Sequence, residues 1–92
     1  MTLQSIKAQF KPGDNWHCIR EEKRPNMPHC IDRNEVRTVK STGGKYLTWV
    51  LPDGRNYDSP WPKASEILDA RDGFVKFHYF DGGVILTFTK ES

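Results

Sequence analysis

Apolar and polar residues alternate along several stretches of this chain, and this period of two predicts β-strands. In residues 46–51, Leu47, Trp49 and Leu51 fall on one side of a strand and the residues between them fall on the other. β-Branched and aromatic residues, which favour strands, are concentrated in the same stretches. The strands predicted in this way are residues 15–21, 35–42, 45–51, 74–80 and 84–90, with a short edge strand at residues 56–58.

Glycine turns separate the predicted strands. Gly43-Gly44, Asp53-Gly54 and Asp81-Gly82-Gly83 are sequences that supply the positive-φ positions of tight hairpins. Trp16 and Cys18 are expected to share one face of the first strand. In the last hairpin, the residues expected to face inward are Val75, Phe77 and Tyr79 on one strand and Val84, Leu86 and Phe88 on the other. The fold is therefore predicted to be mostly β, on the borderline of α+β, as a small antiparallel sheet or a partly open barrel of five to six strands.

Two segments do not follow the strand pattern. Residues 1–10 fit a helical face through Leu3, Ile6 and Phe10, but they also fit an alternating strand, and both alternatives remain open. Residues 22–34 contain two prolines and two asparagines and are predicted to form a long loop. Long ordered loops are often the positions where function is found.

One short helix is expected at about residues 62–71. Pro62 suits the first turn of a helix, and Ala64 is followed at helical spacing by Ile67 and Leu68. Gly73 is then a plausible C-cap residue.

Length and composition set further limits. Ninety-two residues are enough for one domain, residues 1–92, and too few for two. No apolar run approaches the roughly 18–20 residues of a membrane span, and the N-terminus lacks the apolar region of a signal peptide. The protein is therefore expected in the cytoplasm, with no membrane partner and with both cysteines reduced.

The net charge of +2 is unevenly distributed along the chain. Residues 1–45 hold nine Lys or Arg against five Asp or Glu, whereas residues 46–92 hold five against seven. A basic first half favours an anionic partner, either nucleic acid or an acidic protein surface. The residues expected to contact such a partner are Arg20, Lys23, Arg24, Arg33, Arg37, Lys40 and Lys45. Because acidic residues interleave with them, an ordinary solvated surface is the alternative.

Aromatic residues extend this hypothesis. Trp61 lies between Pro60 and Pro62, which hold its ring where it either anchors an interface or covers the end of the core. A basic rim with a nearby tyrosine or tryptophan would also hold phosphates and stack a base, as small β-barrels do.

No pattern in the sequence indicates catalysis, and neither a cofactor nor a metal is expected. His17-Cys18 and His29-Cys30 have the chemistry of zinc ligands. Neighbouring side chains on a strand point to opposite faces, however, so only one residue of each pair would easily reach a shared ion. A thiol nucleophile would also need an orienting group beside it, and the sequence places none there. A non-enzymatic binding protein is the class that remains.

The segment from Phe10 to Pro62 resembles an SH3-like small barrel. Phe10-Lys11-Pro12-Gly13-Asp14 is similar to the turn that opens such domains, and a strand, a long loop, a hairpin and a short closing element follow. The predicted helix and last hairpin depart from that pattern. This resemblance implies an SH3-like or OB-like module that binds DNA or RNA directly through a basic rim.

In its size, its exposed charges and its lack of enzyme motifs, the chain also resembles small phage-encoded inhibitors of host defence, including anti-CRISPR proteins. That resemblance implies a protein that acts in the cytoplasm of a bacterial host cell. It would dock on a larger host protein or ribonucleoprotein complex and block nucleic-acid binding, with possible contacts to guide-RNA or DNA phosphates. This docking inhibitor is the leading hypothesis, and the direct nucleic-acid-binding module is the alternative.

Overall fold

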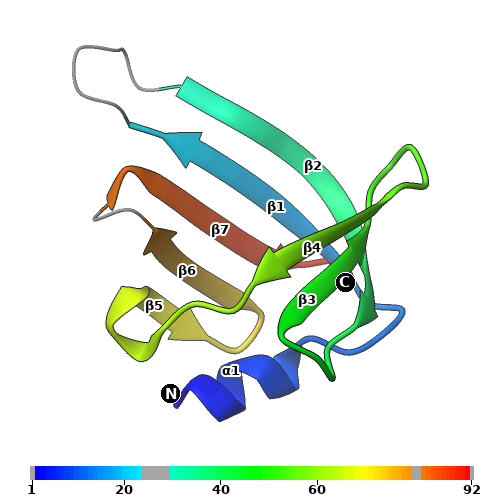
Figure 1. The fold of residues 1–92 in the computed structure, drawn as a ribbon, viewed down its shortest axis with the longest axis horizontal. Helices are drawn as coiled ribbons and strands as arrows, with labels where there is room; N and C mark the ends of the chain where they lie inside the picture. Colours follow the sequence, from blue (N-terminus) through cyan, green and yellow to red (C-terminus); the bar gives the residue numbers. More distant parts are fainter. Residues whose placement is uncertain (1, 24–29, 80–81, 92) are drawn as a thin grey trace.

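The computed structural model describes residues 2–23, 30–79 and 82–91, without the side chains of Cys30 and Asp32. Within these residues, an α-helix, a 3-10 turn and seven strands follow one another along the chain. The elements are α1 (Leu3–Gln9), β1 (Asn15–Glu22), β2 (Cys30–Ser41), β3 (Tyr46–Val50), β4 (Asn56–Pro60), η1 (Ala64–Glu66), β5 (Ile67–Arg71), β6 (Phe74–Tyr79) and β7 (Val84–Lys90). Neighbouring strands are antiparallel, in the order β4-β3-β2-β1-β7-β6-β5 (Figure 1).

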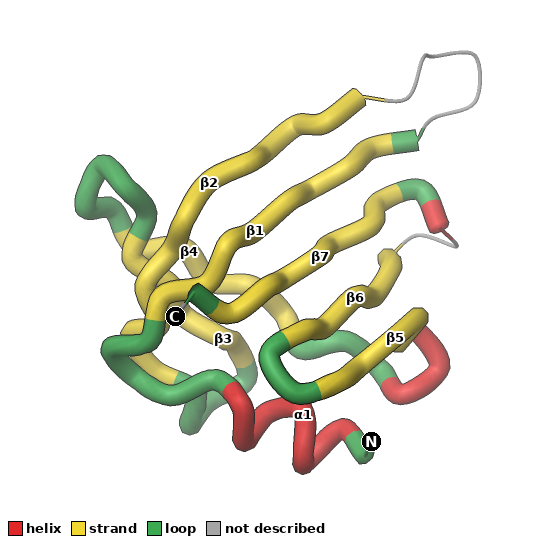
Figure 2. The backbone as a smooth tube through the Cα atoms, turned by 180° about the vertical axis from the view of Figure 1, so that it is seen from behind, coloured by secondary structure: helices red, strands yellow, loops and turns green. Residues whose placement is uncertain are grey.

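The sheet is strongly curved, and α1 lies across one end of its concave side (Figures 1 and 2). The last residue of β4 lies close to β6, where the Tyr79 hydroxyl donates a hydrogen bond to the Pro60 carbonyl. In the described residues the edge strands β4 and β5 do not pair, so the sheet stays open. We call this architecture the half-barrel. It confirms the prediction of a mostly β antiparallel fold, with seven strands in place of five or six.

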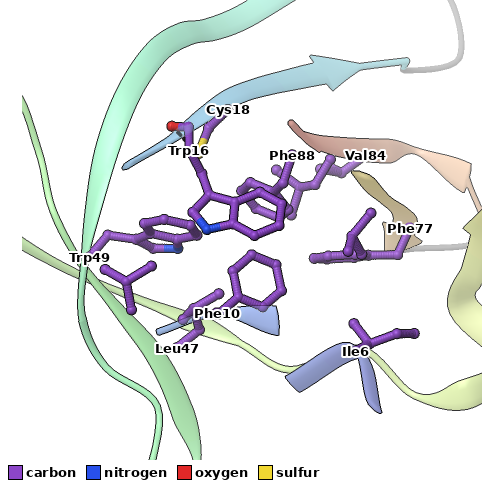
Figure 3. Packing of buried hydrophobic residues seen from close by; sticks show 12 residues of the cluster. Ile6, Phe10, Trp16, Cys18, Leu47, Trp49, Phe77, Val84 and Phe88 are labelled. Carbon is purple, nitrogen blue, oxygen red and sulfur yellow. Dashed lines mark hydrogen bonds between the residues drawn. The ribbon is translucent and has the colours of Figure 1, made fainter. Parts of the chain in front are cut away.

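The core fills the end of the half-barrel next to α1 (Figure 3). Trp16, Trp49 and Phe88 are fully buried, and the rings of Trp49 and Phe88 stack with centroids 5.3 Å apart. Phe10, at the end of α1, contacts Trp16 with ring centroids 4.4 Å apart. Cys18 and the inward-facing residues of the last hairpin are also buried or half-buried, as the alternation predicted.

The N-terminal segment forms a helix and not a strand. The Thr2 hydroxyl accepts a hydrogen bond from the Ser5 amide at 3.1 Å, which caps the first turn. Helical spacing then directs Ile6 and Phe10 into the core, where both are buried.

The prediction of a helix at residues 62–71 is wrong. A single 3-10 turn, η1, covers Ala64–Glu66, and Ile67–Arg71 is strand β5, which pairs with β6. Asp72 and Gly73 form a two-residue hairpin turn in which Arg71 pairs with Phe74 and Gly73 has φ +76. An isolated helix of ten residues is marginal in water, whereas an Asp-Gly turn strongly favours a hairpin.

The long loop is shorter than predicted. β1 continues to Glu22 and β2 begins at Cys30, so part of residues 22–34 belongs to a long hairpin. Its strands stay paired through a register shift beside Arg20. Gly54 and Gly82 have the expected positive φ, but Gly43 and Gly44 do not.

Candidate functional site

The inward side of β1 changes from apolar to charged along the strand. Trp16 and Cys18 are fully buried in the core. The next two inward residues, Arg20 and Glu22, are partly buried and form an ion pair at 2.8 Å between Nη1 and Oε1. The end of the half-barrel away from α1 is therefore lined by charge, and we call this end the mouth.

The inward side of β2 contributes a second ion pair to the mouth. Arg37 is only 3% exposed, and in the described part of the chain it is the only charged residue buried to this degree. Its Nε and Nη2 donate to Oε1 of Glu35 at 3.1 and 3.0 Å, and its guanidinium lies 5.0 Å from the ring centroid of Tyr57. A buried charge is tolerated only when it is paired and hydrogen-bonded, and these contacts fix Arg37 in one position.

A pocket of about 370 Å³ lies at the mouth, on the concave side of the sheet. This volume is at the lower end of the range for small-ligand pockets. Its lining combines an apolar base with charged and hydroxyl-bearing walls. The lining residues are Arg20, Arg37, Tyr57, Ser59, Pro60, Glu66, Tyr79, Val84 and Leu86.

Tyr79 contributes a neutral phenol to this pocket. Burial, reinforced by the negative charge of Glu66, raises the pKa of Tyr79 well above its ordinary value. Its hydroxyl therefore stays protonated and donates to the Pro60 carbonyl. This contact joins β6 to β4 and holds the two walls of the pocket together.

The thiol of Cys18 is held in its protonated form at neutral pH, which disfavours a role as a nucleophile. Burial raises its pKa to about 12, and the opposing effect of the nearby Arg37 charge is smaller. Within the described residues, no group of three or more His, Cys, Asp or Glu is placed to hold an ion, and His29 and the Cys30 side chain lie outside those residues. The pocket can therefore bind through hydrogen bonds, charge and apolar contact.

The structure separates the basic residues that the sequence grouped together. Arg20 and Arg37 line the pocket, and Arg33 is exposed at the same end, 3.9 Å from Glu35. Lys23 is exposed just beyond β1, where its amide donates to the Gly83 carbonyl at 2.7 Å. Arg24 lies outside the described residues.

The other predicted contacts do not line the pocket. Lys40 and Lys45 are exposed at the opposite end of β2 and in the turn that follows it. Trp61 is half-buried and packs against the core, with Lys7 Nζ 5.2 Å from its ring centroid. The seven basic residues therefore do not form one continuous rim in the described part of the chain.

The sequence did not identify the remaining members of the pocket as a site. Ser59, Pro60 and Glu66 come from the segment around β4 and η1, whereas Tyr79, Val84 and Leu86 come from the last hairpin. The inward direction of the hairpin residues could be predicted from alternation. Their proximity to β4 could not, because it depends on the curvature of the whole sheet.

Comparison with known proteins adds no relative: no family model, curated protein or solved structure matches this chain. Among the described residues, the helical segments are too short and too polar to cross a bilayer.

Proposed function

We propose that this protein is a non-enzymatic binding protein that takes up part of a larger protein or ribonucleoprotein at its mouth. One observation carries this proposal: a small domain keeps two arginine–carboxylate pairs around a pocket of about 370 Å³, where apolar residues would pack more simply. Replacing buried ion pairs by apolar residues is often neutral or stabilising. Charges retained in a concave site are therefore best explained by recognition of a ligand.

The lining indicates the chemistry of the group that is bound. Val84 and Leu86 offer apolar contact, the arginines donate hydrogen bonds, and Glu66 and Ser59 can accept them. A side chain with an apolar body and a polar tip, presented by a partner protein, matches this combination. Aromatic and arginine side chains commonly anchor protein interfaces in this manner.

In the more specific form of the proposal, the protein is an inhibitor of the anti-CRISPR type that covers a nucleic-acid-binding surface of its partner. Support comes from Lys23 and Arg33, which are exposed beside the pocket and are suited to contact guide-RNA or DNA phosphates. Docking at the mouth would then place a protein contact and a phosphate contact side by side.

Direct binding of DNA or RNA is the second candidate. The same two exposed cations favour it, together with Tyr57, a pocket residue that is 40% exposed. The two candidates differ in their response to salt. A direct binder would lose affinity for naked nucleic acid steeply with salt, whereas a protein-docking inhibitor would show little affinity for it.

The proposal is tested by filling the pocket. Leu86→Trp adds volume on the concave face, and Ile85→Trp makes the same change at the adjacent position on the convex face. Tagged wild type and both variants would be used to capture proteins from nuclease-treated bacterial lysate, after melting curves establish that both variants are folded. We expect wild type and Ile85→Trp to retain the same protein complex and Leu86→Trp to lose it. Equal capture by Leu86→Trp, or capture of nucleic acid alone without nuclease, would contradict docking at the mouth.

A further inference from the structure

The outer edge of β2 is unpaired over its N-terminal part. β3 pairs with β2 only at Thr38, Val39 and Ser41. From Cys30 to Arg37, β2 therefore has β1 on one side and no described strand on the other (Figures 1 and 2). An open edge of this kind presents backbone N–H and C=O groups that can pair with a strand of another chain.

Two exposed aliphatic side chains lie on this edge. Ile31 is 61% exposed and Val36 is 45% exposed. Both are on the convex face. Their cross-strand partners on β1 are Glu21, opposite Ile31, and His17, opposite Val36. These two partners point outward, because the residues next to them, Arg20 and Cys18, point inward. Neither side chain contributes to the core or to the pocket.

A bulge sets the spacing of the edge. Arg20 pairs with Arg33, and the next residue of β1, Glu21, pairs with Ile31. Asp32 is therefore the extra residue, and Ile31 takes the ladder position next to Arg33. Counted in ladder positions, the unpaired stretch from Cys30 to Arg37 is centred on Asn34.

We propose that β2 of a second copy of this chain pairs antiparallel with this edge, about a two-fold axis through Asn34. Residues that lie opposite each other in an antiparallel pair share a face. In this register, Arg33 of each copy faces Glu35 of the other on the concave side, and Ile31 faces Val36 on the convex side. Moving the axis by one residue would instead place Arg33 or Glu35 opposite its own copy.

The side chains of Arg33 and Glu35 can form the ion pairs that this register places between the two copies. Arg33 is exposed, and its ion pair within the chain is long, at 3.9 Å to Oε1 of Glu35. Both hydrogen bonds from Arg37 also use Oε1. In the described part of the chain no interaction uses Oε2 of Glu35, so this oxygen is left to accept from Arg33 of the second copy.

The dimer has a consequence for the mouth. A two-fold axis perpendicular to the sheet keeps the concave faces of both copies on the same side. The two pockets would then open in the same direction, and one partner with two equivalent segments could engage both. The dimer itself does not depend on the proposed function.

The test is the mass of the protein in solution, measured by sedimentation equilibrium over a range of concentrations. Wild type is expected to approach twice the 10.7 kDa of one chain. The double substitution Ile31→Lys/Val36→Lys opposes like charges at both apolar contacts and is expected to leave only monomer. Leu68→Lys, at a position that is 51% exposed on β5, adds the same kind of charge away from β2 and should leave the dimer intact.

Mixing two single variants tests the register. One copy with Val36→Lys and another with Ile31→Glu would place opposite charges at one contact and keep Ile31 against Val36 at the other. The mixture is therefore expected to form a heterodimer more readily than either variant pairs with itself. The proposal is overturned if wild type is monomeric at every concentration, if the Ile31→Lys/Val36→Lys variant still dimerises, or if mixing gives no preference. A wild-type protein that stays monomeric and binds an extended peptide at this edge would show that the edge pairs with a different partner, which also contradicts the proposal.

Discussion

Inward-facing positions of the strands form a buried core at one end of the half-barrel and a charged pocket at the other. At the end next to α1, which we call the closed end, the inward positions of β1 and β2 hold Trp16, Cys18 and Val39, all fully buried. The neighbouring inward positions hold Arg20, which follows Cys18 on β1, and Arg37, which lies opposite Trp16 on β2, and each arginine is paired with a carboxylate. Alternation therefore defines the inner face of a strand, whereas the side chain at each inward position decides whether that part of the face becomes core or pocket.

The largest effect expected from this comparison is the loss of an aromatic residue at the closed end. Trp49→Ala removes a fully buried ring from the stack with Phe88 and should lower the free energy of unfolding by about 3–5 kcal/mol. Tyr57→Ala at the mouth removes a partly exposed ring and its contact with Arg37, and should cost about 1 kcal/mol or less. Urea unfolding of the two variants measures the difference. Equal losses would contradict the assignment of stability to the closed end.

The buried ion pair at the mouth gives the next largest effect. Arg37→Leu leaves Glu35 without its close partner and should cost about 3 kcal/mol, because a partly buried carboxylate then lacks compensation. Adding Glu35→Leu removes that charge and should recover most of the loss. A double variant as unstable as Arg37→Leu alone would show that the pair stabilises the fold, which would weaken the argument for a role in recognition.

The turn between β5 and β6 gives a smaller effect. Gly73→Ala places a side chain at φ +76 and should destabilise the protein by about 1–2 kcal/mol. The strain comes from the backbone, since the nearest atom to the new Cβ, Lys90 Cβ, is at an ordinary 3.7 Å. Gly44→Ala is the matched control, with open space around it and no positive φ, and should change stability by less than about 0.5 kcal/mol. Similar melting temperatures for both variants would argue against the two-residue turn.

Ionisation of the Cys18 thiol does not change the stability of the protein near neutral pH and lowers it only at alkaline pH. Burial favours the neutral thiol, so its contribution to stability is complete below pH 9 and is lost as the pH rises from 9 toward about 12. Cys18→Ala should therefore be less stable than wild type at pH 7, with a gap that narrows above pH 9. Denaturant titrations of both proteins across this pH range measure the gap. A constant gap would contradict burial of the thiol in the closed end.

Local sequence patterns were sufficient to predict much of the closed end. Alternation identified the inward direction of Trp49, Phe77 and Phe88, because one face of each strand must be apolar when the sheet covers a single core. The helix predicted at residues 62–71 does not form, because the Asp72-Gly73 turn favours a hairpin over the helical spacing of the apolar residues. Tertiary pairing with β6 then determined the structure of that segment.

The mouth was harder to predict from the sequence, because its residues come from segments that are far apart in the chain. Arg20 and Arg37 were recognised as candidate contacts, but their pairing with Glu22 and Glu35 depends on the inward face of the sheet. The approach of Pro60 to Tyr79 depends on the curvature of all the strands between them. Short-range patterns do not encode this curvature, so a charged surface was predicted where the structure has a pocket.

A photoreactive residue at the mouth would show whether a partner protein binds there. Tyr57 lines the pocket and is 40% exposed, whereas Tyr46 is 47% exposed on β3 and does not line it. p-Benzoylphenylalanine would replace each tyrosine in turn, and irradiation in bacterial lysate followed by electrophoresis would reveal covalent adducts. Our account predicts a discrete protein adduct from position 57 and none of the same mass from position 46. The same adduct from both positions, or one from position 46 alone, would contradict the claim that the mouth is the binding site.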